Sequence, residues 1–322
     1  MQKIVSYILL LLIIGLLIFG FDRLQHRQAM QSPGMNEQYY RIVSMPIPAS
    51  LNFAGEDVPL DLFYVREALD RELMVNTYWH SSTLQLIKKT YRFFPVIDSI
   101  LAAHNIPNDF KYLAVIESGL SNVVSPAGAT GFWQLMKGTA KDYGLEVDNE
   151  IDERYHLEKS TETACAYLQK SYQTYGNWTL AAASYNAGQN GINRQIDRQK
   201  SGSYYDLLLN DETARYVFRI LAMKLIIENP GRYGFYLTES DVYQPIPVRK
   251  VAVNDRIKDW ADFAAEQHIS YKLLKYFNPW LRDNELKNRK KKTYYLTLPL
   301  PPYDMTHEEL ILKNNGIKPE GK

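Results

Sequence analysis

A helical apolar period runs through the middle of this sequence, from about residue 77 to residue 228. Several segments within it place apolar side chains three and four residues apart, which is the spacing of one buried helix face. One of them begins near Ser160, carries its stripe through Tyr167 and Leu168, and reaches Gly176, a residue suited to end a helix. The sequence therefore predicts a mainly α-helical domain in this region.

The residues that follow have a different pattern. Residues 249–253 have strand-like composition, two short helical segments come next, and residues 294–298 indicate a closing strand before a proline. This order predicts a small β-α-α-β unit over residues 245–302. The tail over residues 303–322 is expected to be loosely ordered.

The amino-terminal residues differ from both regions. No charged residue occurs between Ile4 and Phe21, and about 18 apolar residues are enough to cross a bilayer. We expect residues 1–23 to form an uncleaved membrane anchor, with a cleaved signal segment as the alternative, and the rest to be exported. Residues 24–76 carry prolines and glycines among polar residues, so they are predicted to be a spacer that ends in a leading helix.

Bulk composition argues against some classes of function. The formal net charge is +1, which gives no electrostatic reason to expect nucleic acid as a partner. The six histidines show no metal-ligand spacing, so no metal or other cofactor is expected. Cys165 is the single cysteine, which excludes an intrachain disulfide, and its apolar surroundings predict a small buried side chain.

The clearest chemical signal is Glu117. Phe110, Leu113 and Ala114 begin an apolar stripe on a short helix that Gly119 can end, and Glu117 takes the next position on that stripe. Burial and the negative end of the helix dipole both favour the protonated carboxyl, which is the form that a general acid needs. From this helix alone, a structural glutamate paired with lysine or arginine explains the pattern equally well.

Further motifs follow downstream of Glu117. A loop of small residues leads into Phe132-Trp133-Gln134, and a helix of small residues ends in a Tyr-Asn pair; each has an ordinary explanation when taken alone. In this order they resemble the soluble lytic transglycosylase catalytic domain, a relative of goose-type lysozyme. The matching blocks are Glu117-Ser118, Gly131-Phe132-Trp133-Gln134, Ser184-Tyr185-Asn186, Glu212-Thr213 and Tyr216-Val217. The departures are Phe132-Trp133 for Leu-Met and Ser184 for Ala.

The resemblance implies a lysozyme-like helical catalytic domain over residues 77–239, similar to the membrane-bound type D branch of that family. It implies cleavage of the MurNAc-β-1,4-GlcNAc bond of peptidoglycan, with Glu117 as sole general acid and base and 1,6-anhydro-MurNAc ends as product. Two alternatives remain open. One is a lysozyme-like muramidase that hydrolyses the same bond with water, and the other is a non-catalytic peptidoglycan-binding scaffold.

The resemblance also implies roles for individual residues. Ser118 and Gln134 would position substrate, Tyr185 would hydrogen-bond to Glu117, Asn186 would support the groove, and Tyr216 would line it. No second carboxylate is expected in a family block near Glu117. A one-carboxylate site suits attack by the sugar's own 6-hydroxyl, because that nucleophile is already tethered to the reacting carbon.

The C-terminal unit resembles a divergent LysM domain, a family that binds chains containing N-acetylglucosamine. The matching residues are Asn254-Asp255, 274–278 and 295–299, whereas the usual Gly-Asp-Thr start is absent and a basic run, 287–292, replaces the usual turn. We therefore expect two partners, peptidoglycan glycan strands and a membrane through the N-terminal segment. The expected location is the bacterial cell envelope, with an inner-membrane anchor and a periplasmic catalytic domain.

Overall fold

The computed structural model describes residues 42–301 and 306–316. All of the helices and strands described here fall within one compact unit, Met45–Lys322. The expected membrane anchor, residues 1–23, and the first part of the spacer lie outside the described residues. Within the described ranges, no helix combines the length and hydropathy needed to cross a membrane.

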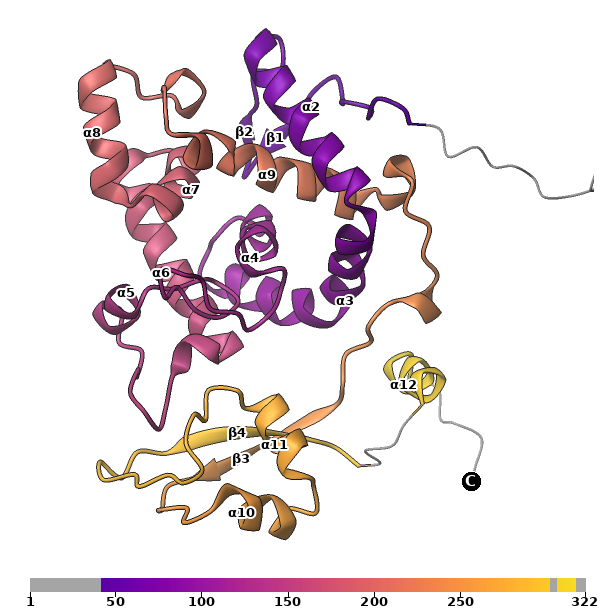
Figure 1. Cartoon of the computed structure of the whole chain (residues 1–322), viewed down its shortest axis with the longest axis vertical. Coiled ribbons are helices and arrows are strands. Elements are labelled where there is room, and N and C mark those ends of the chain that lie inside the picture. The colour runs from indigo at the N-terminus through magenta and orange to yellow at the C-terminus, as the bar shows by residue number, and fades with distance from the viewer. Residues whose placement is uncertain (1–41, 302–305, 317–322) are drawn as a thin grey trace, which may run out of the picture. The chain divides into compact units, whose positions relative to one another are not determined.

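The predicted helical region is confirmed as a helical domain (Figure 1). A two-stranded hairpin, which the sequence analysis did not predict, precedes its first helix. The elements in chain order are β1 (Asn52–Phe53), β2 (Glu56–Asp57), α2 (Phe63–Tyr78), α3 (His80–Ala103), α4 (Lys111–Ser118), α5 (Lys137–Asp142), α6 (Leu157–Tyr175), α7 (Trp178–Ala187), α8 (Gln189–Gln199) and α9 (Asp211–Glu228). The predicted leading helix corresponds to α2.

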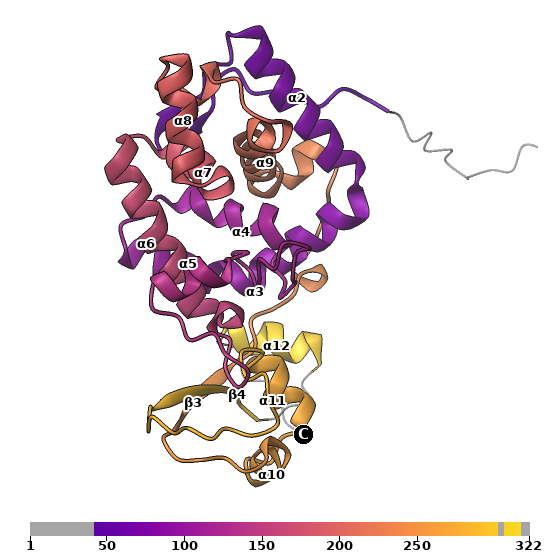
Figure 2. The same ribbon diagram turned by 60° about the vertical axis from the view of Figure 1, so that its left-hand side comes forward.

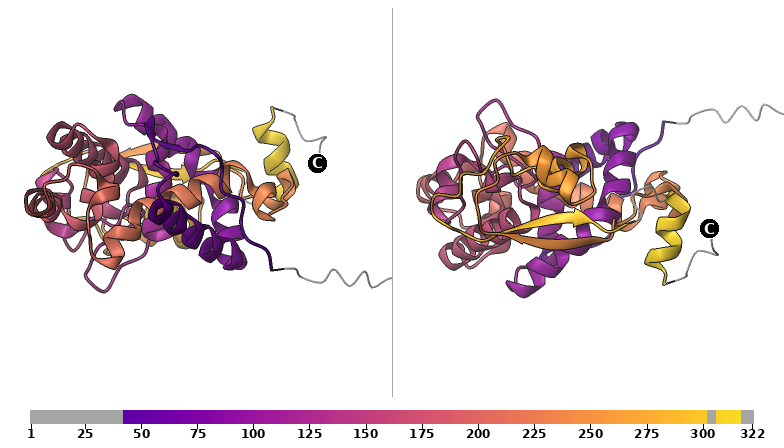
Figure 3. Two further views of the ribbon diagram at one scale, coloured as in Figure 1. Left: turned by 90° about the horizontal axis from the view of Figure 1, so that it is seen from above. Right: turned by 90° about the horizontal axis from the view of Figure 1, so that it is seen from below.

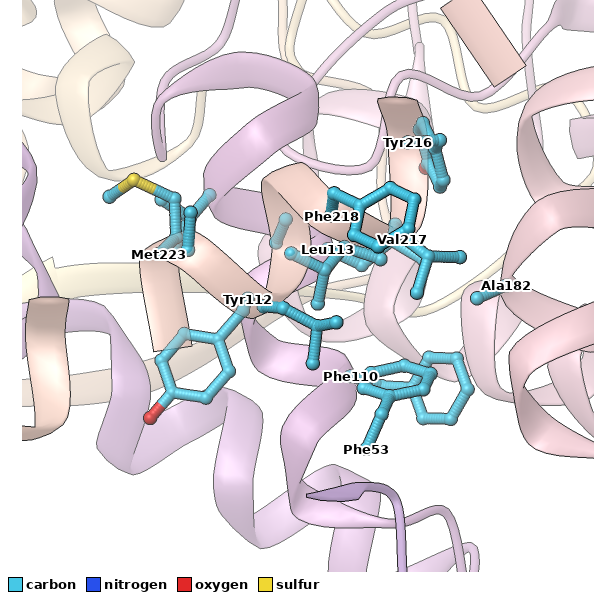
Figure 4. Close-up of a cluster of buried hydrophobic side chains, with 14 of the residues drawn as sticks. Phe53, Phe110, Tyr112, Leu113, Ala182, Tyr216, Val217, Phe218 and Met223 are labelled. Atoms are coloured by element: carbon cyan, nitrogen blue, oxygen red, sulfur yellow. The ribbon is translucent and has the colours of Figure 1, made fainter. Parts of the chain in front are cut away.

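Helix α4 lies in the middle of this domain, between α9 and α3, and contacts both (Figures 1 and 2). Its apolar stripe is buried as predicted, since neither Leu113 nor Ala114 has exposed surface. Gly119 ends the helix with φ +61°, a left-handed conformation that glycine adopts at little cost. Figure 4 shows Leu113 of α4 in one hydrophobic cluster with Val217 and Phe218 of α9.

Helix α6 confirms the prediction made from its apolar stripe. It ends at Tyr175, and Gly176 follows with φ +61°. Cys165 is 1% exposed and lies in the main hydrophobic core, as expected for a small apolar side chain. Burial raises the pKa of its thiol to about 12, so the thiol stays protonated at neutral pH.

The C-terminal region has the predicted β-α-α-β order. Strands β3 and β4 pair antiparallel, with Val248 opposite Pro299 and Val253 opposite Tyr294, and Figure 3 shows them side by side. The elements are β3 (Val248–Val253), α10 (Trp260–Glu266), α11 (Tyr271–Phe277) and β4 (Tyr294–Pro299). They enclose a second hydrophobic core, which also contains Ile151 from the segment between α5 and α6.

The expectation of a loosely ordered tail does not hold for α12 (His307–Asn314). The hydroxyl of Thr306 accepts a hydrogen bond from the backbone N–H of Glu309, and the Glu309 carboxylate accepts one from the N–H of Thr306. This reciprocal cap satisfies two donors at the helix start. The Thr-x-x-Glu spacing of this cap is already present in the sequence.

Candidate active site

Glu117 lies in the last turn of α4 and is half-buried. Its Oε1 accepts a hydrogen bond from the hydroxyl of Tyr216, which comes from α9 and is only 1% exposed. Because α9 contacts α4 directly, this tyrosine reaches the carboxylate from within the core. The hydrogen bond between Tyr216 and Glu117 thus joins α9 to the last turn of α4.

Burial raises the pKa of Glu117 from 4.5 to about 7. The Tyr216 hydrogen bond and the positive charge of Arg219 oppose this rise, since both favour the ionised carboxylate. The negative charge of Glu212 adds to it. A carboxyl group that titrates near neutral pH can both give and take a proton under physiological conditions.

No lysine or arginine among the described residues forms an ion pair with Glu117. Arg219 instead donates from Nη2 to the backbone carbonyl of Ile116, at 3.0 Å. The structural alternative raised by the sequence, a glutamate fixed by a basic partner, therefore does not describe Glu117. It describes Glu72, whose carboxylate pairs with Arg215.

The loop before α5 is tied together by two of the predicted site residues. Gln134 has φ +46°, and its Nε2 donates to the carbonyls of Val123 at 3.0 Å and Gly131 at 2.8 Å. Ser118 Oγ donates to the carbonyl of Phe132 at 2.8 Å and thereby fixes the loop to the end of α4. Both side chains hold backbone in place beside Glu117.

The expected hydrogen bond between Tyr185 and Glu117 is not present. The Tyr185 hydroxyl donates to the carbonyl of Trp133 at 2.7 Å, because α7 faces the loop before α5. Tyr216 takes the expected role instead, and it is a buried partner of Glu117, not a wall residue. Trp133 has no exposed surface and donates from its indole to Thr161, which fits its ordinary explanation as a core residue.

Asn186 connects the end of α7 to the start of α9. Its Nδ2 donates to Glu212 Oε1 at 2.9 Å, and its Oδ1 accepts from Thr213 Oγ1 at 2.8 Å. Glu212 is therefore a second carboxylate whose charge reaches Glu117. The sequence places Glu212 in a family motif, but its proximity to Glu117 follows only from the fold.

A pocket of about 240 Å³ adjoins these residues. It shares Arg219 and Glu212 with the surroundings of Glu117, and Trp79, which is 66% exposed, is one of its walls. Arg219 is not among the predicted site residues, although it lies one helical turn after Tyr216. The lining residues are Glu72, Val75, Asn76, Trp79, Glu212, Arg215 and Arg219. The described residues include no cluster of His, Cys, Asp and Glu suited to holding a metal ion.

The helical domain and the C-terminal unit both match known families. Residues 95–208 match the family described as Transglycosylase SLT domain, and residues 249–301 match Soluble lytic transglycosylase C-terminal LysM-like domain. The chain therefore carries an SLT transglycosylase domain followed by a LysM-like domain, as the motifs predicted.

The chain is also similar to individual known proteins. The chain is 29% identical to membrane-bound lytic murein transglycosylase D from two strains of Escherichia coli, over 228 residues that cover 69% of this chain and 49% of each relative. It thus spans about half the length of these relatives. Among solved structures, the 70 kDa soluble lytic transglycosylase of Escherichia coli matches with a TM-score of 0.39 and 20% identity, over 52% of this chain and 29% of that one.

Proposed function

We propose that this chain is a lytic transglycosylase that cleaves the MurNAc-β-1,4-GlcNAc bond of peptidoglycan and leaves 1,6-anhydro-MurNAc ends. The observation that carries the proposal is Glu117, a carboxyl group with no basic partner among the described residues and a pKa of about 7. Protonated Glu117 gives its proton to the glycosidic oxygen as the bond to the anomeric carbon breaks. The resulting carboxylate then takes the proton of the sugar's 6-hydroxyl, whose oxygen closes on that carbon.

The contact with Tyr216 supports this assignment of roles. The tyrosine hydroxyl occupies Oε1 of Glu117, so Oε2 is the oxygen left to carry the transferred proton. The same hydrogen bond strengthens when the carboxylate is negative, and it therefore stabilises the state formed after proton donation. Tyr185, Ser118 and Gln134 fix the loop beside this pair, and we propose that the loop backbone positions the sugar.

One observation favours the muramidase alternative, namely that a second carboxylate, Glu212, lies near Glu117. A hydrolytic glycosidase of the inverting type uses a second carboxylate to activate water, and the charge of Glu212 reaches Glu117. However, the Glu212 carboxylate accepts a hydrogen bond from Asn186, which gives it a structural role at the start of α9. We therefore favour the intramolecular reaction.

Mass spectrometry of digested peptidoglycan tests the choice. We expect 1,6-anhydro ends from the wild type and none from Glu117→Gln. The exposed residue Glu162 on α6 offers a matched control, and Glu162→Gln should give the wild-type products. Reducing ends would establish the muramidase, unchanged digestion by Glu117→Gln would overturn the mechanism, and a wild type without any digestion would leave the non-catalytic scaffold.

We also propose the cell envelope as the place of action. The relatives are named as membrane-bound, and residues 1–23 have the composition of an anchor that would hold the catalytic domain, residues 77–239, in the periplasm. The LysM-like module, residues 245–302, would bind the N-acetylglucosamine units of the same glycan. Fractionation of cells that produce the full chain, beside a variant with charged residues in the apolar segment, tests the anchor.

A further inference from the structure

The segment between α5 and α6 is built into the C-terminal module. Ile151 is 1% exposed, belongs to the hydrophobic core of the module and forms an antiparallel bridge with Leu281. The backbone N–H of Asp152 donates to the carbonyl of Trp280 at 2.9 Å, and that of Arg282 donates to the carbonyl of Glu150 at 2.8 Å. The module therefore holds the segment through its backbone on both sides of Ile151.

Side chains reinforce this contact. Glu146 accepts hydrogen bonds from the hydroxyl of Tyr294 at 2.9 Å and from Lys292 Nζ at 3.0 Å. Glu150 Oε2 accepts one from the backbone N–H of Lys287 at 2.8 Å. Lys287 and Lys292, two lysines of the basic run over residues 287–292, are thus engaged within the chain.

The same segment holds the loop before α5 through one arginine. Arg154 forms a two-pronged ion pair with Asp152, with Nε–Oδ1 at 2.9 Å and Nη2–Oδ2 at 2.7 Å, and both side chains are buried. The remaining Nη1 donates to the loop carbonyls of Gly128 at 3.0 Å and Leu135 at 3.3 Å. A planar guanidinium suits this task, because its donors point in fixed directions.

The backbone of the loop also lies directly against the backbone of the segment between α5 and α6. A Cβ on Gly131 would lie 2.0 Å from the carbonyl oxygen of Arg154, so only glycine allows this close approach. Ser118 and Tyr185 hold the opposite side of the loop, at the carbonyls of Phe132 and Trp133. The loop is therefore clamped between the helices around Glu117 and a segment that the C-terminal module fixes.

We infer that Arg154 is a positioning residue of the active site, through which the C-terminal module fixes the loop that carries Gln134. The inference rests on the proposed function. The module then has a second role besides glycan binding, which is to hold the loop before α5 in place beside Glu117. Turnover should then depend on the module even for a substrate too short to reach it, because catalytic geometry must hold to within a fraction of an ångström.

The test uses the full chain and a soluble glycan fragment of two disaccharide repeats. Arg154→Lys keeps the charge but loses the two-pronged geometry, and we expect kcat to fall about tenfold or more with a smaller change in KM. Ile151→Ala, which loosens the module's hold without touching Arg154, should change kcat in the same direction. Arg249→Gln is the matched control, because Arg249 contacts Gln267 within the module and should leave kcat unchanged.

Melting temperature and hydrogen exchange separate positioning from loss of fold. We expect faster exchange in residues 123–135 of Arg154→Lys, with α9 as protected as in the wild type. Unchanged kcat in a folded Arg154→Lys protein overturns the inference, as does a loss of kcat that only follows the unfolded fraction. If the wild type turns over no glycan at all, the proposed function fails. The rate of hydrogen exchange in residues 123–135 would still show whether Arg154 holds the loop in place.

Discussion

Two glutamates approach the same helix, α9, and meet opposite kinds of partner. Glu72 on α2 is 1% exposed and pairs with Arg215, with Nε–Oε1 at 2.7 Å. Glu117 on α4 meets Tyr216, the next residue along α9. Arg215 and Tyr216 are neighbours in the chain, but they serve carboxylates on two different helices.

The difference between the partners decides what each carboxylate can do. A guanidinium cancels a buried negative charge, and the resulting pair resists any change in either member. A tyrosine hydroxyl donates one hydrogen bond and leaves the charge uncancelled, so burial still acts on Glu117 and its pKa rises to about 7. Glu72 is thus suited to holding α2 on α9, and Glu117 is suited to moving a proton.

The largest expected effect comes from removing the titrating group. Glu117→Gln keeps the shape of the side chain and abolishes proton transfer, so turnover of peptidoglycan should fall about 10³-fold, a barrier increase of about 4 kcal/mol. Steady-state release of soluble products measures it. Conversely, Glu72→Gln should keep wild-type turnover per folded molecule, and a loss as deep as that of Glu117→Gln would break the distinction between the two residues.

Removing the basic partner of Glu72 should instead damage stability. Arg215→Ala leaves a buried carboxylate without compensation, which costs about 3 kcal/mol, near the low end for buried pairs because Arg215 is itself 31% exposed. Urea unfolding at neutral pH measures the loss. Arg256→Ala is the control, since its exposed pair with Glu285 is screened by solvent and should contribute much less to stability. Equal losses of stability in the two variants would show that burial of Glu72 does not make its basic partner more important than the partner of an exposed carboxylate.

Glu117 should destabilise the folded protein when it ionises. Below pH 4.5 the carboxyl is protonated in both the folded and unfolded chains and has no effect. As the pH rises from 4.5 to about 7, the unfolded chain releases its proton first, so stability falls, by at most about 3 kcal/mol. Glu117→Gln should therefore match the wild type at pH 4 and be more stable at pH 8 in urea unfolding. If Glu117→Gln were less stable than the wild type at pH 8, the ionised Glu117 carboxylate would have a stabilising partner in the folded protein.

The sequence predicted the parts of this site that depend on local pattern. The apolar stripe with Glu117 at its end, the stop at Gly176 and the β-α-α-β order all follow from spacing over a few residues. The resemblance assigned the hydrogen bond with Glu117 to Tyr185, whereas Tyr216 donates it in the structure. Which one reaches Glu117 depends on the packing of α9 against α4, a contact between residues 99 positions apart.

Two other features were invisible for the same reason. The pair between Glu72 and Arg215 joins residues 143 positions apart, so the position of Glu72 on the buried face of α2, beside Leu69 and Leu73, does not reveal its partner. The segment around Ile151 has the composition of an ordinary loop, and its burial depends on a module that begins almost a hundred residues later. Long-range packing, unlike the period of a helix, does not produce a fixed spacing of residues in the sequence.

The smallest and most specific test concerns the hydrogen bond itself. Tyr216→Phe removes an interaction that lowers the pKa of Glu117, so that pKa should rise above its present value of about 7. Because the acid form then persists to higher pH, the basic limb of the kcat profile should move to higher pH, while kcat at the optimum falls only a few-fold. Tyr185→Phe is the matched control, since its hydroxyl serves Trp133 and its loss should leave the limb in place. A limb that moves in Tyr185→Phe and stays fixed in Tyr216→Phe would return the partner role to Tyr185 and remove the contrast between Tyr216 and Arg215.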